Sequence, residues 1–208
     1  MNISKFLLID VAIVIAGIPL VFLLQGDKKK SPLLRSPNKK KLIRKTSVKL
    51  PDKEKLIELE KLARMKGSGI KFDSLKGDWK FVSVWEKDSE NENSIFSSLL
   101  RVFAAKIEFK KDLSNEFPQY FSIVTSIKFG FFSMEFSGSG YLKGKQPILP
   151  FFFNLIQLKS GSSILFSKSL KEPLEKDKSC FEMISSEESY GWLSARGQGG
   201  ALLLWLKD

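Results

Sequence analysis

The side chains that most often carry out catalysis are scarce in this chain of 208 residues. There is no histidine, which removes Ser-His-Asp and Cys-His machinery, the usual zinc ligands and the commonest general base. The single cysteine, Cys180, excludes an internal disulfide and any multi-cysteine metal site, and it fits a small core side chain better than a nucleophile. The carboxylates Glu108, Glu135 and Glu182 remain, but the sequence shows no pairing between them. We therefore expect no enzyme, no bound metal and no cofactor.

Large apolar side chains are abundant instead, since 16 of the 18 Phe and all four Trp follow residue 24. Such side chains can hold a hydrocarbon tail without catalytic groups, because burying apolar surface yields roughly 25 cal/mol per Å². The candidate lipid-binding residues are Trp79, Phe81, Ile127, Phe129, Phe131, Phe153 and Arg196. The alternative is that the aromatic rings simply fill the core.

The net charge of +11 is confined to one part of the chain. Residues 1–71 hold 17 Lys/Arg against 6 Asp/Glu, whereas residues 72–208 hold 17 of each. A domain that binds phosphates is expected to carry its own basic face. We therefore expect no nucleic-acid partner for the C-terminal domain.

An apolar run, residues 6–24, contains only one charged side chain, Asp10. At 1.5 Å per residue, 19 residues are about long enough to cross a hydrocarbon core of roughly 30 Å. A cleaved secretory signal is the alternative, but no small-x-small cleavage site precedes the following "QGDKKK". Residues 1–26 are therefore predicted to be an uncleaved, single-pass membrane anchor.

Residues 28–49 carry ten Lys/Arg and no acid, and they lie directly after the predicted span. Each basic residue close to anionic lipid head groups contributes about 1 kcal/mol of binding. Only Lys5 precedes the span, so the positive-inside rule places the C-terminal part on the cytoplasmic side. Two Ser-Pro pairs and a lack of periodicity predict an extended linker over residues 27–51.

The third segment, residues 52–208, is predicted to begin with a short amphipathic helix. Asp52 is a plausible N-cap and Gly67 ends the helical pattern. The apolar stripe Leu56, Leu59, Leu62 and Ala63 is expected to pack on the domain that follows.

From about residue 75 the pattern changes from helical to alternating. One face of the first segment carries Trp79, Phe81, Ser83 and Trp85, and one face of a later segment carries Ile123, Thr125, Ile127, Phe129 and Phe131. The segment 95–105 is compatible with a helical turn or a strand. About eight short strands joined by Gly/Ser/Asn turns predict an all-β fold, an antiparallel meander closed into a barrel. A barrel of this size is either filled by side chains or holds one small apolar ligand.

Two motifs resemble those of the plastid-lipid-associated protein, or fibrillin, family. "LKGDWKFVSVW" (75–85) is similar to the family's first strand, and "SARGQGGALLLWL" (194–206) is similar to its closing hairpin. The acidic residues and second arginine that the family places before this turn are replaced here by residues 190–193. The resemblance covers about residues 53–208. It implies a lipocalin-like barrel that binds or sequesters quinones, carotenoids or fatty acids at a photosynthetic membrane such as the thylakoid.

The closing hairpin also has a physical interpretation of its own. Its turn, residues 197–200, contains three glycines, which permit the positive φ values of a tight reversal. Arg196 is expected to donate to backbone carbonyls or to pair with a carboxylate, and contact with a lipid carboxylate or a quinone oxygen is the alternative. For the whole protein we expect membrane-tethered binding of small lipophilic molecules. The alternative is a structural or assembly factor for a membrane complex, with a solidly packed barrel.

Overall fold

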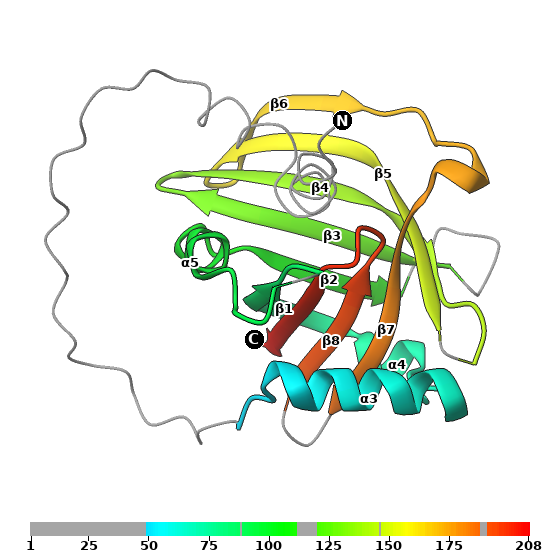
Figure 1. The fold of residues 1–208 in the computed structure, drawn as a ribbon. Coiled ribbons are helices and arrows are strands. Elements are labelled where there is room, and N and C mark those ends of the chain that lie inside the picture. Colours follow the sequence, from blue (N-terminus) through cyan, green and yellow to red (C-terminus); the bar gives the residue numbers. More distant parts are fainter. Residues whose placement is uncertain (1–48, 88, 112–119, 146, 188–190) are drawn as a thin grey trace, which may run out of the picture.

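The computed structural model describes residues 49–87, 89–111, 120–145, 147–187 and 191–208 (Figure 1). Within these residues, three α-helices and a 3-10 turn accompany nine strands. The helices are α3 (Lys53–Lys66), α4 (Phe72–Leu75) and α5 (Ser94–Val102), and the 3-10 turn is η1 (Glu175–Asp177). The strands are β1 (Gly77–Trp85), β2 (Lys106–Lys111), β3 (Tyr120–Phe129), β4 (Phe132–Tyr141), β5 (Ile148–Ser160), β6 (Ser163–Ser169), β7 (Ser179–Glu187), β8 (Trp192–Gly197) and β9 (Leu202–Lys207).

Eight of the nine strands close into an antiparallel barrel, as the alternating pattern predicts. The sheet order is β4-β3-β2-β1-β9-β8-β7-β5-β6, and an additional pairing of β4 with β5 closes the ring. The first four residues of the 13-residue strand β5 pair with β7, and the last six pair with β6. The ninth strand, β6, therefore lies outside the barrel as an extension of β5. Such a closed eight-stranded barrel is compatible with lipocalin-like folds.

Helix α3 packs on the outside of the barrel, as its apolar stripe predicts. The Asp52 side chain caps it by accepting a hydrogen bond from the Lys55 backbone amide at 2.9 Å, and Gly67 ends it with a φ of 88°. Leu56 is fully buried in a cluster that includes Ile184, Trp192, Leu202 and Leu204 of the barrel wall. Leu62 is exposed, so this part of the predicted stripe is wrong: only three of its four members turn towards the barrel.

The segment whose type the sequence left open forms helix α5. Asn93 caps this helix by accepting from the Phe96 amide, and the buried Ser97 hydroxyl accepts from the Val84 amide at 3.0 Å. Phe96 and Leu100 enter the same core cluster as the barrel interior. Because α5 joins the end of β1 to the start of β2, it closes one end of the barrel (Figure 1).

Two details of the predicted alternation are wrong for identifiable reasons. A β-bulge places Val82 as an extra residue against β9, so Trp79 and Phe81 face the interior while Trp85 packs outside in the cluster with Leu56. Strand β3 ends at Phe129, and the following turn leaves Phe131 89% exposed rather than on the face of Ile123 and Ile127.

The predicted membrane anchor lies outside the described residues, as does most of the predicted basic linker. Within the part of the chain that is described, no helix has the length and apolar character that crossing a bilayer requires.

Candidate functional site

The predicted lipid-binding residues fall into three groups in the structure. Trp79, Phe81 and Ile127 are buried in the barrel core, and Phe129 and Phe153 pack against that core while remaining partly exposed. Phe131 lies at the tip of the β3–β4 hairpin, and Arg196 lies on the outer side of the barrel. The structure thus brings five of the seven residues into or next to one apolar cluster.

Aromatic side chains of the described strands pack closely in the barrel interior. The rings of Phe151 and Phe181 stack with centroids 4.9 Å apart, and Phe181 meets Trp205 edge-on at 5.7 Å. The polar group of the buried Trp79 indole is also satisfied, since its Nε1 donates to the Leu75 carbonyl at 2.6 Å. Rings packed in this way occupy this part of the interior, among the residues that the structure describes.

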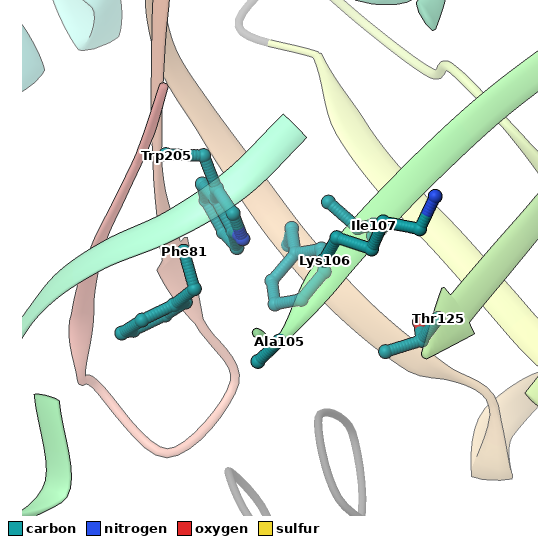
Figure 2. Close-up of a pocket in the computed structure, with 7 residues that line it drawn as sticks. Phe81, Ala105, Lys106, Ile107, Thr125 and Trp205 are labelled. Carbon is teal, nitrogen blue, oxygen red and sulfur yellow. The ribbon is translucent and has the colours of Figure 1, made fainter. Parts of the chain in front are cut away.

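One small cavity lies within this packing, between the rings of Phe81 and Trp205 on one side and Thr125 on the other (Figure 2). Its volume is about 10 Å³. That volume suffices for about one water molecule, whereas sites for drug-sized ligands are typically 300–1,000 Å³. The buried Thr125 hydroxyl has no hydrogen-bond partner among the described residues, so a water at this position would satisfy it. The cavity is thus far smaller than a site for a lipophilic ligand.

An open apolar surface lies where β3, β4, β5 and β6 extend beyond the barrel. We call this extension the flap and define it as residues 127–136 and 155–169. Neighbouring strands place four side chains in one row across it: Ile127, Met134, Leu158 and Phe166. Ile127 is buried in the barrel core, Met134 and Leu158 are half-buried, and Phe166 is 52% exposed. The row therefore forms a continuous apolar path from the core to the solvent.

The two faces of the flap differ in polarity. The inner face, which carries this row, also presents the stacked pair Phe129 and Phe132. On the outer face the rows are mainly polar, and Lys159 forms an ion pair there with Glu135. The inner face of the flap is consequently the candidate binding surface. Sequence reasoning missed Phe132, Met134, Leu158 and Phe166, although the alternation of Phe132 and Met134 with polar residues in 132–135 is a usable signal.

Arg196 is held outside the barrel by a carboxylate of helix α3. Its Nε donates to Glu60 Oε1 at 2.6 Å, its Nη2 donates to Glu60 Oε2, and its Nη1 donates to the Gly200 carbonyl at 2.7 Å. Arg64 also donates to Glu60, at 2.9 Å. Burial alone raises the pKa of the Glu60 carboxyl, but the hydrogen bonds and charges of Arg196 and then Arg64 outweigh burial and hold the pKa below its ordinary value. Arg196 therefore ties the closing hairpin to α3, and lipid contact by its guanidinium stays a prediction.

The remaining side chains that could take part in chemistry lie apart from one another. The carboxylates among them lie next to cations, and the thiol is held in its neutral form. Glu108 pairs with Lys110 at 2.8 Å, and Glu182 lies 3.4 Å from Arg64. Burial, and to a lesser extent Glu182, raise the pKa of the Cys180 thiol, which disfavours the thiolate. No cluster of three or more His, Cys, Asp or Glu side chains that could hold a metal ion occurs among the residues whose placement is described.

In comparisons with known proteins, no family model, no curated protein and no solved structure matches this chain. The resemblance of the two end motifs to the plastid-lipid-associated family is accordingly a prediction, and the supported description is the closed antiparallel barrel.

Proposed function

We propose that this protein binds small lipophilic molecules at a membrane surface, along the inner face of the flap rather than inside the barrel. The observation that supports this proposal is the row from Ile127 to Phe166, which leaves an apolar sheet face open to solvent next to a filled core. Monomeric soluble proteins rarely leave contiguous apolar surface of this kind uncovered unless it serves an interaction.

The ligand class follows from the chemistry of this face. Its half-exposed members are Phe, Leu, Met and Ile, and its nearest cation on the same face is Lys168, in the row of Phe136 and Ile156. A long hydrocarbon with one polar or anionic end fits such a surface: the chain lies on the apolar row and the polar end reaches the lysine. Fatty acids, quinones and carotenoids are the proposed classes. A photosynthetic membrane, implied by the end motifs, is part of the proposal.

The proposal is tested with the full chain held in amphipol and titrated with a fluorescent polyene fatty acid. Replacing Phe166 by serine removes the exposed end of the row, so binding is expected to weaken by roughly tenfold or more, the equivalent of one buried Phe side chain. Ile164, which is 55% exposed on the same strand but on the outer face, supplies the control. Ile164→Ser is expected to change the affinity less than about threefold, because surface substitutions outside a site have small effects. Equal affinities for both variants, or no binding by the unchanged chain, would contradict the proposal.

The close packing of the described core side chains favours one second function, an assembly factor that docks on a membrane complex without carrying a ligand. In that case the chain binds no fatty acid or quinone, and the purified protein carries a membrane protein in a fixed ratio. The titration above separates the two functions, because only the first predicts saturable binding by the isolated chain.

A further inference from the structure

The tip of the flap exposes apolar side chains on both of its faces, although the outer row there also carries Lys128, Ser133 and Lys159. Phe131 protrudes from the β3–β4 turn, and the start of β6, which pairs with the end of β5, exposes Ile164, Leu165 and Phe166. Phe132 and Phe166 lie on the inner face, whereas Ile164 shares a row with Lys159 on the outer face. The Gly161 amide donates to the Phe131 carbonyl at 3.4 Å, so the two turns are neighbours.

Helix α5 contributes to the same end of the molecule. Val102 is exposed at its last turn, and the carbonyl of the next residue, Phe103, accepts a hydrogen bond from the Lys128 amide of β3 at 2.6 Å. Figure 1 shows α5 beneath the tip of the flap. We call this set the tip surface: Val102, Phe131, Phe132, Ile164, Leu165 and Phe166.

We propose that the tip surface inserts into the interface of an anionic bilayer and holds the open end of the flap against it. This inference rests on the proposed function, because it takes the bilayer as the source of the lipophilic ligand. A protein partner covers one face of a sheet, whereas a bilayer surrounds a protruding tip on all sides. Here apolar side chains protrude from the turn, at Phe131, and from both sides of the start of β6, at Ile164 and Phe166.

Charge complementarity favours anionic lipid and also sets the orientation. Lys128 is exposed beside the tip, and Lys168 is exposed further along β6, next to Ser169. The acidic loop before α5, residues 86–93, lies at the other end of that helix and is repelled by the same lipids. The ten Lys/Arg of residues 28–49 add attraction to anionic lipid without setting the orientation of the barrel. The molecule therefore approaches the bilayer with the tip of the flap nearest to the membrane surface.

The depth of insertion is limited by the backbone of β6. This strand is the last in the sheet order, so its outer edge presents backbone groups that pair with no neighbouring strand among the described residues. Unpaired N–H and C=O groups do not enter the hydrocarbon region, where each costs several kcal/mol. Only the tip can insert, to the boundary between head groups and acyl chains, and the far end of β6 at Ser169 stays in water.

The test uses the full chain carrying Cys180→Ser and one new cysteine labelled with an environment-sensitive fluorophore. The labelled positions are Phe131→Cys at the tip, Ser169→Cys at the far end of β6, and Lys111→Cys at the opposite end of the barrel. Vesicles contain either phosphatidylcholine alone or a 7:3 mixture with phosphatidylglycerol, with or without lipids bearing a nitroxide quencher on the upper acyl chain.

With the anionic vesicles, only the label at position 131 is expected to shift to the blue and to be quenched, with the other two labels unchanged. Lys128→Glu together with Lys168→Glu is expected to reduce this quenching, since each lysine beside an anionic surface contributes roughly fivefold in affinity. A label at 131 that stays water-like on anionic vesicles overturns the proposal, whether or not the chain remains bound to the vesicles. A blue shift without vesicles that grows with protein concentration also overturns it, in favour of a second copy. Fatty-acid titration of the unlabelled chain in amphipol reports the proposed function separately, because no bilayer is present there.

Discussion

Replacing Arg196 by methionine is expected to lower the free energy of unfolding by about 3–5 kcal/mol, the range for removing one member of a buried ion pair. The carboxylate that it leaves behind, Glu60, has a side chain only 7% exposed, and Arg196 supplies two of its hydrogen bonds. The same change removes the donor to the Gly200 carbonyl in the closing turn. Chemical unfolding of the full chain, followed by tryptophan fluorescence, measures the loss.

Arg64 supplies the matched control, because it contacts the same carboxylate from a side chain that is 56% exposed. Arg64→Met is expected to cost less than about 1 kcal/mol, as exposed ion pairs do. Equal losses for the two variants would show that the Arg196 contacts do not stabilise the hairpin.

The same carboxylate predicts a dependence of stability on pH. Because the pKa of Glu60 is lowered in the folded protein, the ionised form contributes stability above the unfolded pKa of about 4.3, and this contribution is lost as the pH falls through the folded pKa. Glu60→Gln mimics the protonated state. The stability difference between the unchanged chain and this variant is therefore expected to be full at pH 7 and to shrink below about pH 4.5. A difference independent of pH would contradict this account of the pair.

Replacing Gly138 by alanine is expected to destabilise the barrel by more than about 3 kcal/mol, because the added atom meets backbone rather than a movable side chain. A Cβ at this position lies 1.8 Å from the Phe152 carbonyl oxygen and 2.7 Å from the Phe153 Cα. The β4–β5 register shifts at this point, so the close approach occurs in the pairing that closes the ring. A thermal melt followed by circular dichroism measures the effect.

Gly197→Ala is the control for Gly138→Ala. The nearest atoms to an added Cβ there, on Ala201 and Leu203, lie at 3.8 and 3.9 Å, which is ordinary contact. The chain at Gly197 does not adopt a positive φ, so alanine is expected to fit with little change in melting temperature. If both variants have the same melting temperature as the unchanged chain, β4 and β5 do not approach as closely at Gly138 as the pairing requires.

The barrel itself was predictable because most of its strands alternate with a period of two. The alternation failed at Val82, where the bulge shifts the register against β9 and sends Trp85 outside, and at Gly130, whose φ of 63° turns the chain before Phe131. Both failures depend on pairing with a neighbouring strand, and the sequence of one strand does not contain that information.

The contacts of Arg196 show a second limit. Its position before a glycine turn predicted a donor to backbone carbonyls or a carboxylate pair, and the structure has both. The partner, Glu60, is 136 residues away in the sequence, on a helix whose docking site follows only from the closed barrel. Of the turn glycines, Gly200 alone uses a positive φ among the described residues.

The sequence also left open whether the barrel is hollow. The answer depends on how rings such as Phe151, Phe181 and Trp205 interlock, and small shifts in strand register change the enclosed volume by more than the composition does. The flap could not be predicted from the sequence either. It arises because the 13-residue strand β5 pairs first with β7 and then with β6.

Methionine methyl groups offer the most direct test of where a ligand lies. Met134 is on the inner face of the flap, Met183 is in the barrel core, and Met65 is exposed on α3 as a reference. In the full chain carrying ¹³C-labelled methionine methyls in amphipol, titration with a fatty acid is expected to shift the Met134 signal and to give cross-peaks between that methyl and the alkyl chain. The signals of Met183 and Met65 are expected to stay in place. Cross-peaks from the alkyl chain to Met183, with Met134 unmoved, would place the ligand inside the barrel and contradict the central claim.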